Sequence, residues 1–229
     1  MPSGKVISTD KTRAYSASTS FNLTVLISGS GSNLQALIDA CDAEIKHVIS
    51  NRREAYGLTR AMEAHIPTTY HNLLEYKKRY PDDVQAARNH YDADLAQKIL
   101  THIPSPDLVV CAGWMHILSP VFVNALAAAN VPVINLHPAL PGQFNGANAI
   151  GRAYEAFKKG EITNTGIMVH YVEADVDMGP PVMVKEVRCK SGDSQEDLEK
   201  RIHETEWKLI VEATGKVLAQ LEAQRRSES

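Results

Sequence analysis

The sequence lacks the features that mark disulfide-rich, membrane-spanning and nucleic-acid-binding proteins. It has only 3 cysteines, widely spaced and without a Cys-x-x-Cys pair, which fits a reducing compartment better than a disulfide framework. No apolar run approaches the roughly 18 residues that a membrane helix needs. The formal net charge of -3 provides no basic excess for a nucleic-acid backbone. We therefore expect a cytoplasmic protein that acts on small molecules, with neither a membrane nor a nucleic acid as its partner.

Metal-binding and targeting signals are also sparse. The 9 histidines form neither a His-x-x-x-His nor a His-Glu-x-x-His pattern, so we expect no metal site. Cys111 lies in an apolar run, which favours a core position over a nucleophile. Residues 1–20 are rich in Ser, Thr and Lys and have no apolar core, which is typical of a disordered tail and not of a secretory signal. Organelle targeting by this tail is an open alternative.

The rest of the chain predicts one α/β domain over residues 21–229, because apolar strand-like runs alternate with helical patterns and no repeat or linker interrupts them. Its sheet should be mostly parallel and covered by helices, with the last two strands antiparallel because few residues separate them. The expected strands are 21–28, 45–50, 66–70, 107–112, 131–137, 165–172 and 181–187. The expected helices are 34–40, 55–65, 81–100, 119–129, 148–159 and 194–222, with residues 71–80 as a loop.

One strand ends in a pair of chemically capable side chains. The apolar run 131–134 predicts a buried strand that continues into Asn135 and His137 and stops at a proline. Residues i and i+2 of a strand share a face, so the amide and the imidazole can point into one space. Ligands bind at this end of the strands in an open α/β sheet. An amide can donate to an oxygen that gains negative charge, and a histidine can move a proton. The alternative is that both side chains only hold a loop in place.

A second turn, residues 172–180, supplies carboxylates after another strand-like run. Asp177 lies in an Asp-x-Gly-Pro turn, whereas its rival Asp175 lacks that context. A carboxylate beside His137 would favour the imidazolium form and fix the orientation of the ring. We therefore expect Asp177 to raise the pKa of His137.

A glycine-rich turn, residues 29–33, joins the first strand to the first helix. Free backbone N–H groups and the helix dipole favour an anion at such a junction. The turn lacks the third glycine of a dinucleotide fold, and no acid follows the second strand, where Asn51, Arg52 and Arg53 stand. The pattern therefore indicates a monophosphate and not NAD, with an ordinary tight turn as the alternative.

Four motifs in this order make the chain resemble the phosphoribosylglycinamide formyltransferase family of folate-dependent enzymes, from about residue 23 to residue 218. They are Leu26-Ile27-Ser28-Gly29-Ser30-Gly31-Ser32-Asn33, Ala112-Gly113-Trp114-Met115-His116-Ile117-Leu118-Ser119-Pro120, Ile134-Asn135-Leu136-His137-Pro138 and Asp177-Met178-Gly179-Pro180. The resemblance implies one α/β domain with a seven-stranded sheet and helices on both faces. It also implies transfer of the formyl group of 10-formyltetrahydrofolate, as co-substrate, to the amine of 5-phosphoribosylglycinamide in purine biosynthesis. We expect a monomer or weak homodimer that needs no metal.

The resemblance assigns roles to individual residues. Asn135, His137 and Asp177 match the catalytic group. The substrate-binding positions are Gly31, Ser32 and Asn33 around the phosphate, Glu206 at the ribose, and Arg88, which lies in an Arg-x-x-Tyr-Asp motif and matches a basic helical residue near the substrates. The folate pocket matches Met115, His116, Ile117 and Leu118 together with Asn135.

This chain departs from the family pattern at two places in the site. His116 stands where relatives usually have arginine, and residues 139–150 differ from the usual loop after His-Pro. Two enzymatic alternatives are a formyltetrahydrofolate hydrolase, whose relatives carry an amino-terminal regulatory domain, and a methionyl-tRNA formyltransferase, which has an extra carboxyl-terminal domain. A non-catalytic nucleotide-binding module would keep the glycine turn without needing Asn135, His137 and Asp177 together.

Overall fold

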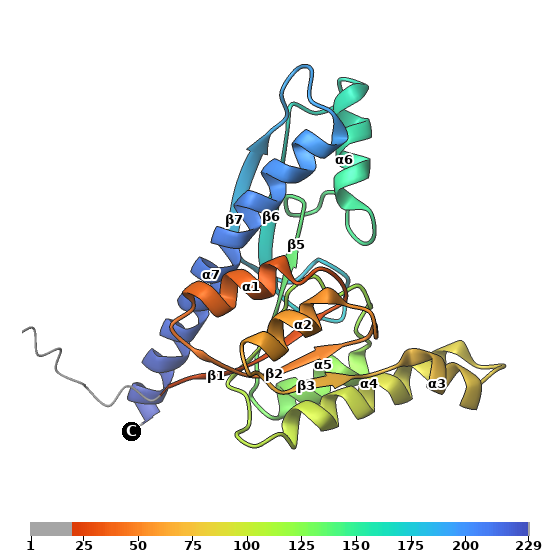
Figure 1. Ribbon diagram of the computed structural model, residues 1–229, viewed down its shortest axis with the longest axis vertical. Coiled ribbons are helices and arrows are strands. Elements are labelled where there is room, and N and C mark those ends of the chain that lie inside the picture. Colours follow the sequence, from red (N-terminus) through yellow and green to blue (C-terminus); the bar gives the residue numbers. More distant parts are fainter. Residues whose placement is uncertain (1–19, 229) are drawn as a thin grey trace, which may run out of the picture.

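A computed structural model describes residues 20–228 and shows one seven-stranded sheet in the order β3-β2-β1-β4-β5-β6-β7 (Figure 1). Strands β3, β2, β1, β4 and β5 are parallel, and β6 and β7 are antiparallel to each other, as predicted. Strand β6 is also antiparallel to β5, which was not predicted. The strands are β1 (Asn22–Ile27), β2 (Glu44–Ser50), β3 (Thr68–Tyr70), β4 (Leu108–Cys111), β5 (Val133–His137), β6 (Asn164–Tyr171) and β7 (Pro181–Arg188). The disordered tail predicted over residues 1–20 lies outside the described residues except for Ser20.

Helices cover both faces of the sheet, which confirms the predicted α/β class. They are α1 (Ser32–Ala40), α2 (Tyr56–Glu63), α3 (Leu73–Arg79), α4 (Val84–Leu100), α5 (Pro120–Ala128), α6 (Ala149–Lys158) and α7 (Gln195–Glu228). In Figure 1, α7 runs beside β6 and β7 and reaches α1. No helix in the described part of the chain combines the length and the apolar character that a membrane span requires.

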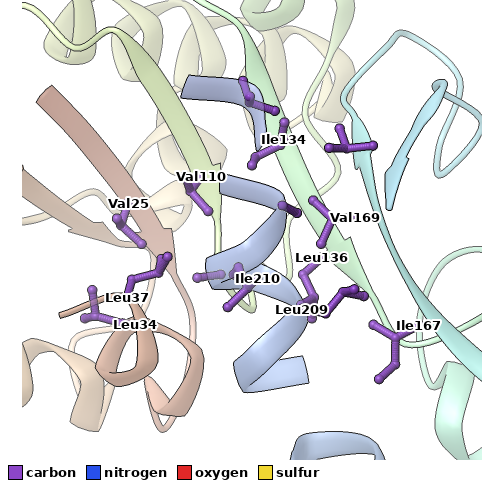
Figure 2. Packing of buried hydrophobic residues seen from close by; sticks show 14 of the residues in the cluster. Val25, Leu34, Leu37, Val110, Ile134, Leu136, Ile167, Val169, Leu209 and Ile210 are labelled. Carbon is purple, nitrogen blue, oxygen red and sulfur yellow. The ribbon is translucent and has the colours of Figure 1, made fainter. Parts of the chain in front are cut away.

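One hydrophobic core lies between the sheet and helices α1, α2 and α7. Figure 2 shows Val25, Val110 and Ile134 from three neighbouring strands facing Leu34 of α1 and Ile210 of α7. Every second residue of β1, β4 and β5 belongs to this layer, because side chains alternate across a strand. Helix α7 therefore packs against β1, β4 and β5, the strands that lead into the site.

The opposite face of the sheet packs against α3, α4 and α5 in a second core. Tyr91 of α4 and Phe122 of α5 are fully buried there against Leu26 and Val133. Cys111 belongs to this layer, and burial raises the pKa of its thiol to about 12, which confirms a core position. Val133 is on the same face of β5 as Asn135 and His137. These two polar residues therefore lie on the α4 and α5 side of the sheet, beyond the last apolar residue of this core on β5.

The structure differs from the predicted elements mainly around residues 71–84. Residues 73–79 form helix α3 and not a loop, because the Asn72 side chain caps the Leu74 amide and Tyr76 packs into the core. Helix α4 begins at Val84 and not near Pro81, since the Asp83 carboxylate accepts from the Ala86 amide. The remaining boundaries differ by a few residues, except that the last helix continues to residue 228.

Candidate active site

The carboxyl ends of β1, β4 and β5 open into a cavity of about 680 Å³. It collects ten residues that the sequence singled out: Gly31, Ser32, Asn33, Met115, His116, Ile117, Leu118, Asn135, His137 and Glu206. Asp177 joins them from the loop between β6 and β7. The fold therefore brings together segments that are more than 150 residues apart in the chain.

Asn135, His137 and Asp177 contact one another at the wall of the cavity. Nδ1 of His137 lies 3.4 Å from Oδ2 of Asp177, and Nδ2 of Asn135 donates to Oδ1 of Asp177 at 3.4 Å. The side chains of His137 and Asp177 are only 6% and 9% exposed, so solvent screens their interaction weakly. Asp175 is exposed, and Asp177 is the carboxylate that meets His137.

The backbone around Asp177 is shaped to present this carboxylate. Asp177 has a left-handed φ of 56°, a conformation that aspartate tolerates better than most residues. A Cβ at Gly179 would lie 1.9 Å from the carbonyl oxygen of Tyr171, so only glycine fits the tight return into β7. The amide of Gly146 donates to Oδ2 of Asp177 at 2.7 Å from the loop after β5.

His170 completes the polar group and was missed by the sequence analysis. Antiparallel pairing sets it directly opposite Asn135, whose Nδ2 lies 3.1 Å from Nε2 of His170. Its Nδ1 donates to the Tyr171 carbonyl at 2.9 Å, so the neutral ring can accept from the Asn135 amide. The sequence offered one signal for His170, which is a histidine directly after the apolar run Ile167-Met168-Val169 of a predicted strand.

The protonation state of His137 differs from the expected one. Burial lowers the pKa of His137 and outweighs the opposing effect of Asp177, while His170 and Arg152 lower it further. The prediction of a raised pKa was wrong in its net direction, although Asp177 does act in the predicted sense. For Asp177, burial opposes ionisation, but its interactions with His170, the Gly146 amide and His137 outweigh it and lower the pKa. Near neutral pH, the free site therefore holds a neutral imidazole beside a carboxylate.

The glycine turn forms the amino end of α1 at the other side of the cavity. Gly31 is the N-cap residue with a φ of 71°, and a Cβ there would lie 2.4 Å from Cα of Gly57. The first amides of a helix have no partner within the helix, so the N–H groups of Ser32 and Asn33 are available to an anion. This geometry suits the predicted phosphate cradle.

Glu206 reaches the cavity from α7 and lies against the same turn. Its carboxylate is 4% exposed and accepts from Nδ2 of Asn33 at 3.3 Å. Burial raises the pKa of Glu206, against the opposing effects of His203 and Asn33. A buried carboxylate beside the anion site is suited to accept hydrogen bonds from sugar hydroxyl groups.

The loop after β4 forms an apolar wall of the cavity. Met115 and Ile117 are 71% and 53% exposed, whereas Leu118 packs into the core. His116 turns its ring away from the solvent, and its Nε2 lies 2.8 Å from Oδ1 of the fully buried Asp92. His116 is among the residues that line the cavity, but Nε2 of its ring contacts the buried Asp92.

Two basic residues occupy unexpected positions. Arg88 is exposed on α4 and is not among the residues that line the cavity. Arg52 follows β2 and does line the cavity. The sequence analysis gave Arg52 no role and mentioned it only to show that no acidic residue follows the second strand. In residues 20–228, no group of three or more His, Cys, Asp or Glu side chains is arranged to hold a metal ion.

The fold and the Asn-His-Asp group point to a formyl transferase, and comparison with known proteins agrees. Residues 21–214 match the formyl transferase family model, and the chain belongs to that family. Within it, the chain is 53% identical over 204 residues to the phosphoribosylglycinamide formyltransferase of Schizosaccharomyces pombe, covering 86% of this chain and 97% of the relative. It is 45% identical to the Dictyostelium discoideum enzyme of the same name, covering 84% and 96%.

Solved structures show the same likeness. The phosphoribosylglycinamide formyltransferase from Streptococcus pneumoniae matches with a TM-score of 0.74 and 28% identity, covering 86% of this chain and 99% of that structure. Glycinamide ribonucleotide transformylase 1 from Symbiobacterium toebii matches with a TM-score of 0.72 and 33% identity, covering 85% of each chain. The predicted family and fold are confirmed.

Proposed function

We propose that the chain transfers the formyl group of 10-formyltetrahydrofolate to the amine of 5-phosphoribosylglycinamide. The observation that carries the proposal is the contact of Asn135, His137 and Asp177 at one wall of a cavity whose other wall is a helix amino end. Family membership and the named relatives support the same reaction. The folate supplies an activated formyl carbon, which the amine attacks to form a tetrahedral adduct.

Asn135 is positioned to stabilise the oxygen of that adduct. Its two amide hydrogens face His170 and Asp177, and the contact to Asp177 is the longer at 3.4 Å. An oxygen that gains negative charge can take the place of this weak contact while the bond to His170 holds the amide in place. Removing such a donor typically costs about 10²–10³ in kcat.

His137 is positioned to move the proton. Asp177 lies beside Nδ1, and Nε2 has no hydrogen-bond partner among the described residues, so Nε2 is the atom left for a substrate. A neutral ring can accept a proton from the attacking nitrogen, and Asp177 then stabilises the imidazolium that forms. The same ring can deliver the proton to the leaving nitrogen, directly or through water.

The remaining residues place the two substrates. The amides of Ser32 and Asn33 would hold the phosphate, and Glu206 would accept from the ribose. Met115 and Ile117 offer an apolar surface to a flat pterin ring. Nε1 of Trp114, which also lines the cavity, is buried without a partner among residues 20–228 and fits a polar ring edge. The residues present therefore suit a folate.

The test is an absorbance measurement of formylfolate turnover with and without 5-phosphoribosylglycinamide. We expect turnover to depend on the nucleotide and formylated nucleotide to accumulate in equal amount. Equal turnover in water alone would support the hydrolase. Binding of the nucleotide without any turnover would support the non-catalytic module.

A further inference from the structure

The loop after His137 is held from the outside by Arg152 on the first turn of α6. Nη2 of Arg152 donates to the carbonyl oxygens of Phe144 and Asn145, the latter at 2.7 Å. The guanidinium also lies over the Phe144 ring, 5.9 Å from its centroid. Arg152 thus grips two consecutive residues of the 138–148 loop through both backbone and ring.

One of the two bound residues, Asn145, adjoins the amide that binds Asp177. Gly146, the next residue, donates its amide to Oδ2 of Asp177 at 2.7 Å. Arg152 therefore holds the residue that directly precedes the amide bound to Asp177.

The loop does not hold this shape through its own preferences. Phe144 and Asn148 have left-handed φ values of 49° and 54°, and Gly142 and Gly146 in the same loop are also left-handed. A residue with a Cβ is disfavoured in such a conformation, and asparagine is disfavoured less than most. A strained loop of this kind persists only where the surroundings hold it. Arg152 supplies that support from outside the cavity, since it does not line it.

We propose that Arg152 is a positioning residue for formyl transfer. By binding the carbonyls of Phe144 and Asn145, it holds the Gly146 amide on Asp177 and keeps Asp177 aligned with His137. The inference rests on the proposed function for its kinetic consequence, but the contact between Gly146 and Asp177 can be measured without turnover. No residue pattern in the sequence indicates this role, because Arg152 is an exposed arginine on a helix.

The test compares three variants of the full chain. Arg152→Met removes the donors and the charge but keeps an extended side chain, and Arg152→Lys keeps charge and donors. Lys159→Met, at the exposed end of the same helix, is the matched control. For each protein, kcat, both KM values and the hydrogen exchange rate of the Gly146 amide are measured.

We expect Arg152→Met to lower kcat by about 10- to 100-fold, since a misplacement of about 1 Å can cost about 10²-fold. The KM for the nucleotide should stay within about twofold, because the phosphate cradle is on α1. Exchange at Gly146 should become at least about tenfold faster, and Arg152→Lys should recover most of both losses. Lys159→Met should behave as the parent chain.

Unchanged kcat or unchanged Gly146 exchange in Arg152→Met would overturn the proposal. A rise in the nucleotide KM with kcat unchanged would also overturn it, because it would make Arg152 a substrate contact. If Arg152→Met does not fold, Arg152→Lys alone decides. Parental kcat and parental exchange at Gly146 in Arg152→Lys support the proposal. If Arg152→Lys is also unfolded, the residue is needed for folding and the proposal is refuted. Absence of turnover in the parent chain would refute only the proposed function. The exchange rates would still show whether Arg152 holds the Gly146 amide on Asp177.

Discussion

Replacing Asp177 with asparagine tests the core of the site, because it removes one charge and keeps the size of the side chain. The carboxylate lies 3.4 Å from Nδ1 of His137 and is 9% exposed. At this separation, two unit charges interact by about 5 kcal/mol with an effective dielectric constant near 20. That energy acts only when His137 is protonated, which is the state formed as the amine attacks.

The loss should therefore appear in kcat. Each 1.36 kcal/mol in the barrier is a factor of about ten, so about 5 kcal/mol sets an upper limit between 10³- and 10⁴-fold. The asparagine dipole retains part of the interaction, and we expect kcat to fall by about 10²- to 10³-fold. The KM for the nucleotide should change little, because Ser32 and Asn33 lie on another element.

The pH profile provides a second measurement. Burial lowers the pKa of His137, and Asp177 partly opposes this effect. Without the carboxylate, the pKa of His137 falls further, so the imidazolium is lost earlier as the pH rises. The limb assigned to His137 should move to lower pH, and histidine NMR titration should show the same shift without turnover.

Asp175→Asn is the matched control, because Asp175 is an exposed carboxylate of the same loop that also lines the cavity. We expect nearly unchanged kcat for this variant. A folded Asp177→Asn protein with near-parental kcat and an unmoved pH profile would refute the role of the charge. A loss of the same size in both variants would point to the loop and not to the contact with His137.

Three further changes probe the cradle, the pocket wall and a buried histidine. Gly31→Ala should destabilise the chain by about 2 kcal/mol or more in urea unfolding and raise the nucleotide KM, because its φ is 71° and a Cβ would meet Gly57 at 2.4 Å; equal stability would contradict the close approach. Asp92→Asn should raise the KM for formylfolate more than the KM for the nucleotide. This buried carboxylate accepts from the Ser119 amide at 2.7 Å and contacts His116 at 2.8 Å, both in the loop that forms the pocket wall. An unchanged folate KM would show that the Asp92–His116 contact does not shape this wall. Burial, with a smaller effect of His102, lowers the pKa of His47 to about 4, whereas the unfolded chain binds this proton near the ordinary histidine pKa of 6.5. The unfolded state therefore binds the proton first, and stability should fall as the pH drops from about 6.5 to about 4. His47→Gln should flatten this part of the urea-unfolding profile, and an unaltered slope would show that other groups cause it.

Local chemistry made much of the molecule predictable. The β-branched runs identified the strands, because such residues pack well in a sheet that is buried on both faces. Strand alternation placed Asn135 and His137 on one face, and the left-handed φ of Gly31 accounts for the glycine at that position. The start of α7 is also local, since Ser194 and Asp197 bond to each other's amides there. Each of these features depends on neighbours in the chain.

Features that depend on distant segments could not be predicted in this way. His170 belongs to the site only because antiparallel pairing sets it opposite Asn135. Arg88 shared a motif with the family, yet its helix presents it to solvent away from the lining residues. The ring of His116 turns inward because Asp92, 24 residues earlier, offers a buried carboxylate.

The protonation of His137 shows why tertiary structure decided the rest. The sequence correctly indicated a carboxylate that raises its pKa, but the burial that outweighs this effect comes from the whole fold. The sequence by itself determined which groups meet along each strand and turn. Only the packed structure decided how much water each group retains, and that sets the charge with which His137 meets its substrate.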